Sequence, residues 1–388
     1  MDKLFGLVFK NKYLFKLIFR YSRLYLKNER VKFYSRETLS NYSEREYIGK
    51  LVYYGGELLE IGDLPNNGVL KEVSFFSKEA PRDGKIIPYG VEVIQLNGVF
   101  VPLDTFPSTI NKITYLVIPI EKEIFEIPPN ITSLSIYKCS LNNILKYLPN
   151  TIKELEFDLF YEDDLVDVQP KIILPNNLIK LSLGKYNIKY LDEGILPITI
   201  KQLEISTCKT NNQFDLDNNE FFENNSNYSI GLFNILKPLK NLEVLSITTN
   251  SWISKESNLK DCNSIKDLTI HCNNSYRIDF LEDSIEEHSL PQSVTKLKLL
   301  NFTNNQIKSN VIPIGVLSLT IDRIEIDQMP QSLTHLKLYE KPNYFYTEQE
   351  SLSLLSKLPK SLTKLTVPSY LNDFNLIYPD NIKNIKFR

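Results

Sequence analysis

A ten-residue pattern of apolar and polar positions recurs along the chain. Each copy starts with an apolar residue and proline, and it has further apolar residues at positions 5, 8 and 10. The clearest copies begin at Leu148, Leu174, Leu290, Met329 and Leu358. Looser copies begin at Leu64, Ile87, Phe106, Ile127, Leu196, Ile312 and Tyr378, and two partial copies that lack the proline are found at Asn241 and Asn263. Because the last residues alternate between apolar and polar, each copy predicts a short strand with one buried face.

The spacing of the copies predicts the architecture. Successive prolines are mostly 19 to 22 residues apart, which is the period of a leucine-rich repeat. Proline lacks an N–H and disfavours helix in the residue before it, so it turns the chain into each strand. We therefore predict a repeat solenoid: short parallel strands in one continuous concave sheet, irregular loops on the convex side and a helical N-terminal cap. Residues 61–388 would form about 13 coils, and an Asn-rich stretch near 209–234 is an insertion or an eroded coil.

The pattern also assigns a register to each coil. Positions 7, 9 and 11 should point to the open face of the sheet, and positions 8, 10 and 13 should point inward. Leucine-rich repeats place Asn or Cys at position 13, where this chain has Cys139, Cys208, Asn250 and Asn273. Other coils have bulky residues there, such as Phe160. We expect wider and less regular coils than in a consensus array.

The phrase Leu-Pro-x-[Asn/Ser]-apolar-Thr-x-Leu-x-apolar resembles the FNIP repeat, a relative of the leucine-rich repeat. The copies LPQSVTKLKL, MPQSLTHLKL and LPKSLTKLTV carry the resemblance best, and a looser similarity covers roughly residues 64–388. The Phe-Asn-x-Pro tetrapeptide of that family is reduced to fragments here, such as Tyr186-Asn187. The resemblance implies the coil fold and no functional residue.

Residues 1–60 are expected to form the basic helical cap. Leu7, Leu14 and Tyr21 recur at helical spacing among lysines and arginines, and a capping box at Ser43–Glu46 predicts a second helix that runs to Gly55. Three interpretations remain open: a cap whose apolar stripe is buried on the first coil, a degenerate F-box-like segment of a ubiquitin-ligase substrate receptor, or a basic helix that docks on a membrane surface or an acidic partner. The last two require exposed apolar residues.

Composition and charge exclude several classes of function. Residues 1–36 contain ten Lys or Arg and two acidic residues, but the whole chain has a net charge of −2, so nucleic acid is not expected as a ligand. No apolar run is long enough to span a bilayer, and Lys10 and Lys12 interrupt the first apolar stretch before it could be a signal peptide. The four cysteines have no metal or disulfide spacing. These features predict a cytoplasmic protein.

Charged residues on the predicted open face are the candidate partner-binding site. The early coil at Leu148 has an acidic set and the late coils have a basic set, so the face would be acidic toward its first half and basic toward its last. Solvated charge without function explains the same residues. The candidates are Glu154, Glu156, Asp158, Lys296, Lys298, His335, Lys337, Lys364 and Lys386.

The sequence contains no catalytic motif. His271 and Cys272 are adjacent in a predicted strand, so their side chains should diverge. We expect no enzyme activity, no cofactor and no metal site. Trp252 and the Tyr344–Tyr346 stretch lie in loops, where aromatic residues are either interface anchors or packing residues. The sequence therefore predicts a protein–protein interaction scaffold, with a ubiquitin-ligase substrate receptor and a peripheral membrane protein as alternatives.

Overall fold

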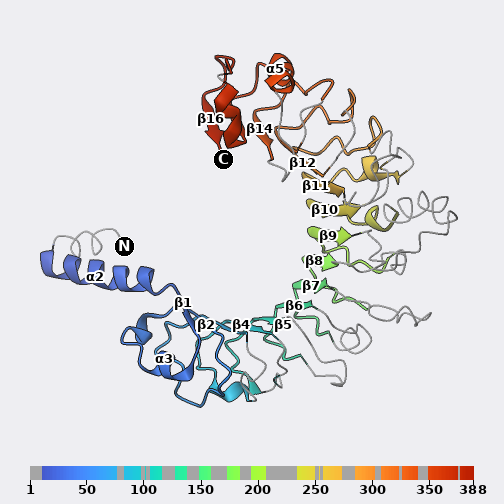
Figure 1. Ribbon diagram of the computed structural model, residues 1–388. Helices are drawn as coiled ribbons and strands as arrows, with labels where there is room; N and C mark the ends of the chain where they lie inside the picture. Colours follow the sequence, from blue (N-terminus) through green and yellow to red (C-terminus); the bar gives the residue numbers. More distant parts are fainter. Residues whose placement is uncertain are drawn as a thin grey trace, which may run out of the picture. The chain divides into compact units, whose positions relative to one another are not determined.

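The chain forms two compact units, Met1–Pro175 and Asn176–Arg388. The computed structural model (Figure 1) describes residues 11–76, 83–97, 101, 105–115, 127–137, 148–158, 173–183, 194–206, 234–249, 253, 257–272, 285–301, 307–322, 326–339, 348–374 and 376–388. Both units consist of short parallel strands that follow one another in chain order. The predicted leucine-rich-repeat-like solenoid is confirmed, with sixteen parallel strands among the described residues.

The first unit begins with a helix and continues as a parallel sheet. Helix α2 is followed by a strand, the short helix α3 and a single 3-10 turn, and six further strands then complete this unit. The helices and the turn are α2 (Lys12–Lys27), α3 (Arg36–Ser40) and Arg45–Tyr47, with another 3-10 turn at Gly84–Ile86. The strands are β1 (Arg30–Phe33), β2 (Lys50–Tyr53), β3 (Glu72–Phe75), β4 (Val93–Leu96), β5 (Lys112–Tyr115), β6 (Ser133–Tyr137) and β7 (Glu154–Asp158).

The second unit has nine strands in the same parallel arrangement. They are β8 (Lys180–Leu183), β9 (Gln202–Ser206), β10 (Val244–Thr249), β11 (Asp267–Cys272), β12 (Lys296–Leu300), β13 (Ser318–Ile321), β14 (His335–Leu338), β15 (Lys364–Val367) and β16 (Asn384–Phe387). Helix α5 and two 3-10 segments lie between strands, at Glu348–Ser356, Leu259–Asp261 and Ser369–Phe374.

The core of each unit consists of the apolar positions of the repeated phrase. In the coil at Leu148, Ile152, Leu155 and Phe157 at positions 5, 8 and 10 are at most 2% exposed. The strand register aligns these positions from coil to coil, so that Leu134 lies beside Leu155 and Leu297 beside Leu319. Stacked leucines and isoleucines therefore form continuous buried columns. The predicted inward direction of positions 8 and 10 is confirmed.

Proline at position 2 begins a tight turn that leads into each strand. Its carbonyl accepts a hydrogen bond from the N–H of position 5, for example at 3.0 Å from Ile131 to Pro128 and from Leu362 to Pro359. The i to i+3 spacing is that of a β-turn. Proline fits here because the position donates no hydrogen bond and its φ is already restricted. The turn directs the position 5 side chain inward.

A ladder of side-chain hydrogen bonds joins successive coils at position 4. Here a Ser, Thr or Asn side chain donates to the main-chain carbonyl of position 5 in the preceding coil, as Ser361 does to Leu333 at 2.7 Å. The donors are Thr109, Asn130, Thr151, Thr199, Ser293, Ser332, Ser361 and Asn381. These bonds satisfy carbonyls outside the strands. They explain the polar residue that recurs at position 4, to which sequence reasoning assigned no role.

The second helix predicted in the N-terminal segment is wrong. After the turn at Arg45–Tyr47, residues Lys50–Tyr53 form β2, which pairs in parallel with β1 and β3. Leu51, Val52 and Tyr53 are buried, and β-branched Val52 and aromatic Tyr53 favour a strand over a helix. The sheet therefore begins at Arg30, within the segment expected to be a helical cap.

Strands β9 and β10 are direct neighbours despite the long segment between them. Val244 pairs with Gln202 and Thr248 with Ser206, in the same register as other strand pairs. The interpretation of the Asn-rich stretch as an eroded coil would place a further strand between β9 and β10, and the sheet has none at that place. Residues 207–233 lie outside the described residues, as do Cys139, Cys208, Asn250 and Asn273, so position 13 of these coils stays a prediction.

Loss of a position 4 hydroxyl should destabilise the solenoid. We expect Ser293→Ala and Ser361→Ala each to lower the free energy of unfolding by about 1 kcal/mol, because each leaves a carbonyl without its donor. Urea denaturation would measure this, with Ser318→Ala on the open face as the control. Ser361→Asn should retain stability, since Asn occupies position 4 in other coils. Equal midpoints for Ser361→Ala and Ser318→Ala would contradict the ladder's role.

Candidate functional site

The open face of each sheet is built from positions 7 and 9 of the coils. Strand β12 shows the alternation: Lys296 and Lys298 are exposed, whereas Leu297 and Leu299 are buried. The parallel register places position 7 residues in one row across the strands and position 9 residues in another. Because the inward residues determine the fold, the two outward rows can vary in chemistry without changing the sheet.

The acidic candidates lie on β7 in the first unit. Glu154 is exposed and Glu156 is half-buried, and each accepts a hydrogen bond from a serine on β6. Ser133 Oγ donates to Glu154 Oε2 and Ser135 Oγ to Glu156 Oε2, both at 3.1 Å. The serines hold the two carboxylates side by side on the open face. Asp158 is the last residue of β7, and its side chain lies outside the described residues.

The basic candidates lie on the last five strands of the second unit. In the position 9 row the register aligns Lys298 of β12, Thr320 of β13, Lys337 of β14, Thr366 of β15 and Lys386 of β16. Lysine therefore recurs on every second strand, which corresponds to a spacing of roughly 9.6 Å between their Cα atoms at the usual strand separation. This row of three lysines and two threonines is called the lysine row below.

The residues of the position 7 row add to this charge unequally. Lys296 Nζ lies 3.1 Å from the Asp267 carboxylate on β11, so much of its charge is compensated. Lys364 is exposed, and His335 is half-buried with Nδ1 at 2.8 Å from Thr334 Oγ1. At positions 7 and 9 of β12–β16 there is no carboxylate. The lysine row is therefore the least compensated group of cations on this face.

The first three strands carry an aromatic stack that sequence reasoning missed. Tyr34, Tyr54 and Phe76 each follow directly after a strand and stack on one another, with ring centroids 5.2 Å apart in both pairs. Tyr34 is 69% exposed. The aromatic residue after each of the segments RVKF, KLVY and EVSF was the available signal. Recognising it required placing β1 and β2 in the sheet.

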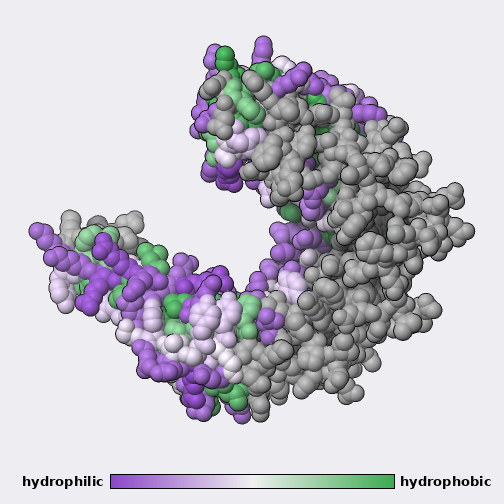
Figure 2. All heavy atoms as spheres, viewed as in Figure 1, coloured by the Kyte–Doolittle hydropathy of each residue, from purple (hydrophilic) through white to green (hydrophobic). Residues whose placement is uncertain are grey.

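Helix α2 does not bury an apolar stripe on the first coil. No residue of α2 is buried, and Leu17 and Leu24 are only half-buried. Large apolar side chains on it are exposed: Tyr13, Leu14, Phe15, Ile18, Phe19, Tyr21, Tyr25 and Leu26. Figure 2 shows hydrophobic and hydrophilic residues side by side along this helix. Within residues 12–27 the apolar side chains thus stay largely exposed, while residues 1–10 lie outside the described residues, and the cap interpretation stays a prediction.

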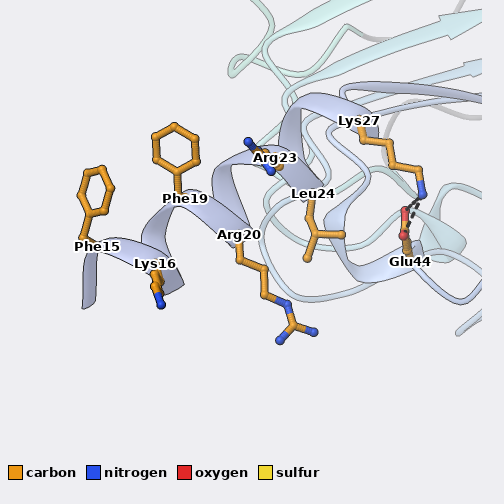
Figure 3. Close-up of a pocket in the computed structure, with 8 residues that line it drawn as sticks. All are labelled: Phe15, Lys16, Phe19, Arg20, Arg23, Leu24, Lys27 and Glu44. Atoms are coloured by element: carbon orange, nitrogen blue, oxygen red, sulfur yellow. Dashed lines mark hydrogen bonds and ion pairs between the residues drawn. The ribbon is translucent and has the colours of Figure 1, made fainter. Parts of the chain in front are cut away.

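The end of α2 is fixed to the first coil by polar contacts. Lys27 Nζ lies 2.8 Å from the Glu44 carboxylate (Figure 3), and Asn28 is fully buried with its Nδ2 donating to Leu24 O and Glu44 Oε2. Tyr42 OH donates to Asn28 Oδ1 at 2.5 Å. The hydrogen bonds from Lys27 and Asn28 lower the pKa of Glu44, because they stabilise its charged form.

The described cysteines are buried, and His271 lies within hydrogen-bonding distance of Asn301. Cys272 is buried and His271 is half-buried with Nε2 at 2.7 Å from the Asn301 amide, so the two side chains diverge as predicted. Burial raises the pKa of the Cys262 thiol to about 11, which disfavours a reactive thiolate. Within the described ranges no group of His, Cys, Asp and Glu could hold a metal ion. Trp252 and Tyr344–Tyr346 lie outside those ranges.

No helix in the part of the chain that the structure describes is long and apolar enough to cross a membrane.

Comparison with known proteins supports the repeat class. No known family profile matches the chain. The chain is similar to AMV014/Q3, an uncharacterised leucine-rich repeat-containing protein of Amsacta moorei entomopoxvirus. The two are 25% identical over 285 residues, which cover 68% of this chain and 53% of that protein. The chain thus spans about half the length of this relative. The repeated phrase and the sheet of parallel strands together define a leucine-rich-repeat-like solenoid, and the finer resemblance to the FNIP repeat stays a prediction.

One solved structure shows the same fold. CroV588, described as a circular leucine-rich-repeat protein, is similar with a TM-score of 0.51 and 19% identity over 93% of this chain and 53% of its own. LegL7 of Legionella pneumophila, also a leucine-rich-repeat protein, is similar with a TM-score of 0.32 and 15% identity over 78% of this chain and 84% of its own. The CroV588 similarity extends to the fold alone.

The Glu44 contact should be visible in its titration. Because its pKa is lowered in the folded state, Glu44 contributes stability that is complete above its ordinary value of 4.5 and is lost as the pH falls through the folded pKa. NMR of a selectively labelled Glu carboxyl should give a midpoint below 4.5. Lys27→Met should move the midpoint upward, because it removes the largest cause of the shift. An unchanged midpoint in Lys27→Met would contradict the assigned cause.

Proposed function

We propose that the protein is a non-enzymatic binding scaffold whose second unit binds an acidic segment of a partner protein on the open face. The observation that carries the proposal is the lysine row, with Lys298, Lys337 and Lys386 on alternate strands. Clustered cations without neighbouring carboxylates attract an anionic partner and increase its association rate. The threonines between the lysines add hydroxyl groups that can bond carboxylates.

An extended chain fits the shape of this row better than a helix end or a small ligand. The register places one member of the row on each of five successive coils. A polyproline II segment rises about 3.1 Å per residue, so every third side chain repeats at about 9.3 Å. That repeat is close to the spacing of alternate strands. A partner segment with a carboxylate at every third residue is the best match.

The middle lysine is held in place by its neighbours. Lys337 is half-buried, and its Nζ lies 5.3 Å from the centroid of the Tyr339 ring, which is 50% exposed. A cation above an aromatic face is stabilised by the ring and loses less entropy when it binds a carboxylate. Lys298, by contrast, is exposed. Lys337 should therefore contribute more to affinity than Lys298.

The acidic pair on β7 extends the same proposal to the first unit. Glu154 and Glu156 are oriented by serine hydroxyls and would bind a basic residue of a partner. They provide two carboxylates from one strand, whereas the lysine row spans five strands. We therefore regard the lysine row as the main contact of the scaffold.

Charge reversal in the lysine row should weaken binding without lowering stability. We expect Lys298→Glu with Lys337→Glu to reduce the affinity for a synthetic peptide, Glu-Pro-Pro repeated four times, by tenfold or more, about 1.4 kcal/mol. Fluorescence anisotropy of the labelled peptide would measure this at low and physiological salt, because screening weakens such contacts. The unfolding midpoint should stay the same.

A control variant with the same change in net charge separates the effect of the lysine row from the effect of the overall charge. Lys237→Glu with Lys360→Glu changes two exposed lysines outside positions 7 and 9. This double variant should bind the peptide nearly as the natural protein does. Equal losses in the two double variants would leave only a non-specific charge effect, and unchanged binding in Lys298→Glu with Lys337→Glu would remove the proposal.

A further inference from the structure

Helix α2 has its positive charge in a single stripe. Its basic residues are separated by four, four, three and four residues, which places them on one side of a helix. The stripe consists of Lys12, Lys16, Arg20, Arg23 and Lys27, and α2 contains no acidic residue. The rest of the helix surface is apolar or aromatic apart from Ser22. This distribution is strongly amphipathic.

An exposed apolar ridge borders the basic stripe. Phe19 is 49% exposed and Leu26 is 73% exposed, and both lie on the same side of the helix because they are seven residues apart. The Arg23 guanidinium lies 5.2 Å from the centroid of the Phe19 ring, so cation and ridge are in contact. Ile18, at 38% exposure, extends the apolar surface around the helix.

The contacts described between α2 and the first coil involve its C-terminal part. Tyr21 and Tyr25 pack on Tyr47, with centroids 6.0 and 5.4 Å apart, and Lys27 binds Glu44. Figure 1 shows the helix projecting beyond β1. Tyr21 and Tyr25 thus pack on the first coil, whereas Phe19 and Leu26 remain 49% and 73% exposed.

An open groove runs along this part of the helix. It has a volume of about 510 Å³, and Phe19, Arg20 and Arg23 contribute to its lining together with Phe15, Lys16, Leu24, Lys27 and Glu44. Figure 3 shows the rings of Phe15 and Phe19 on one side of the helix and the side chains of Lys16 and Arg20 on the other. The groove is therefore lined by both aromatic and cationic side chains, and these lie on separate sides of an amphipathic helix.

We propose that α2 binds the surface of an anionic phospholipid bilayer and lies in its headgroup region. The ridge of Phe19, Ile18 and Leu26 would enter the acyl boundary. The stripe residues Lys12, Lys16, Arg20 and Arg23 would contact lipid phosphates, whereas Lys27 stays paired with Glu44. At 16 residues the helix is shorter than the roughly 20 needed to span a bilayer, so it lies along the surface. This proposal is independent of the lysine row, which lies on the other unit.

A membrane suits this helix better than an acidic protein groove. A helix in a groove usually presents a narrow apolar seam, whereas here exposed apolar residues extend from Tyr13 and Leu14 through Ile18 to Leu26. Exposed aromatic residues are also frequent in this helix, at Tyr13, Phe15, Phe19 and Tyr21. Tyrosine in particular is enriched at membrane–water interfaces. The stripe and this broad apolar surface complement a flat, negatively charged bilayer.

Vesicle flotation with the full chain tests the proposal. We expect binding to phosphatidylcholine vesicles that contain phosphatidylserine, and at least tenfold weaker binding to phosphatidylcholine alone. Lys16→Gln with Arg20→Gln should reduce binding about 25-fold, at about fivefold per basic residue. Phe19→Ser with Leu26→Ser should reduce it more than tenfold, because apolar burial is lost. Glycerophosphoserine should not displace the protein, since a soluble headgroup offers no acyl boundary.

Control variants distinguish insertion from general loss of structure. Ile314→Ser with Ile377→Ser removes two apolar residues that are 80% and 90% exposed on the second unit, and it should bind vesicles normally. Circular dichroism melting should be the same for all variants. Absence of vesicle binding by the natural protein, or equal binding by the Phe19 and Leu26 double variant, would overturn the proposal. Loss of a ubiquitin-ligase adaptor from that variant without any vesicle binding would instead assign α2 to a protein partner.

Discussion

The hydrogen bond from position 4 of one coil to the carbonyl of position 5 in the preceding coil sets the arrangement of this solenoid. That carbonyl lies just before the strand, where the sheet offers it no regular partner, and an unpaired group there would be costly to bury. A short side chain with a donor satisfies it, as in Ser332 and Asn381. Coils that have this bond are thereby joined to their predecessors at the turn as well as through the strands.

The sequence predicted the parts of the fold that depend on this repeating geometry. Proline at position 2 and apolar residues at positions 5, 8 and 10 act locally, so strands such as β7 and β12 could be placed without knowledge of their neighbours. The first two strands lack the Leu-Pro phrase. The polar run at Ser43–Glu46 favoured a helix, but pairing with β3 provides more burial for Leu51 and Tyr53 than a helix on the surface would.

The candidate site was predictable to a different extent. The outward direction of Lys298 and Lys337 follows from alternation, and their alignment follows once the strands are parallel and in register. The pairing of Lys296 with Asp267 and the orientation of Glu154 by Ser133 depend on side-chain conformations that alternation does not determine. The exposure of α2 was also not predictable, because an amphipathic pattern indicates an apolar face without showing what covers it.

The direct pairing of β9 with β10 shows how this architecture can change during evolution. Residues 207–243 separate β9 from β10 in the sequence, yet Leu203 and Leu245 lie side by side and are at most 2% exposed. The entropic cost of loop closure grows only slowly with length, by about 0.6 kcal/mol per doubling. Loops between coils can therefore lengthen and acquire new sequences while the buried columns and the outward rows keep their alignment. New recognition segments can arise in such a protein without a new fold.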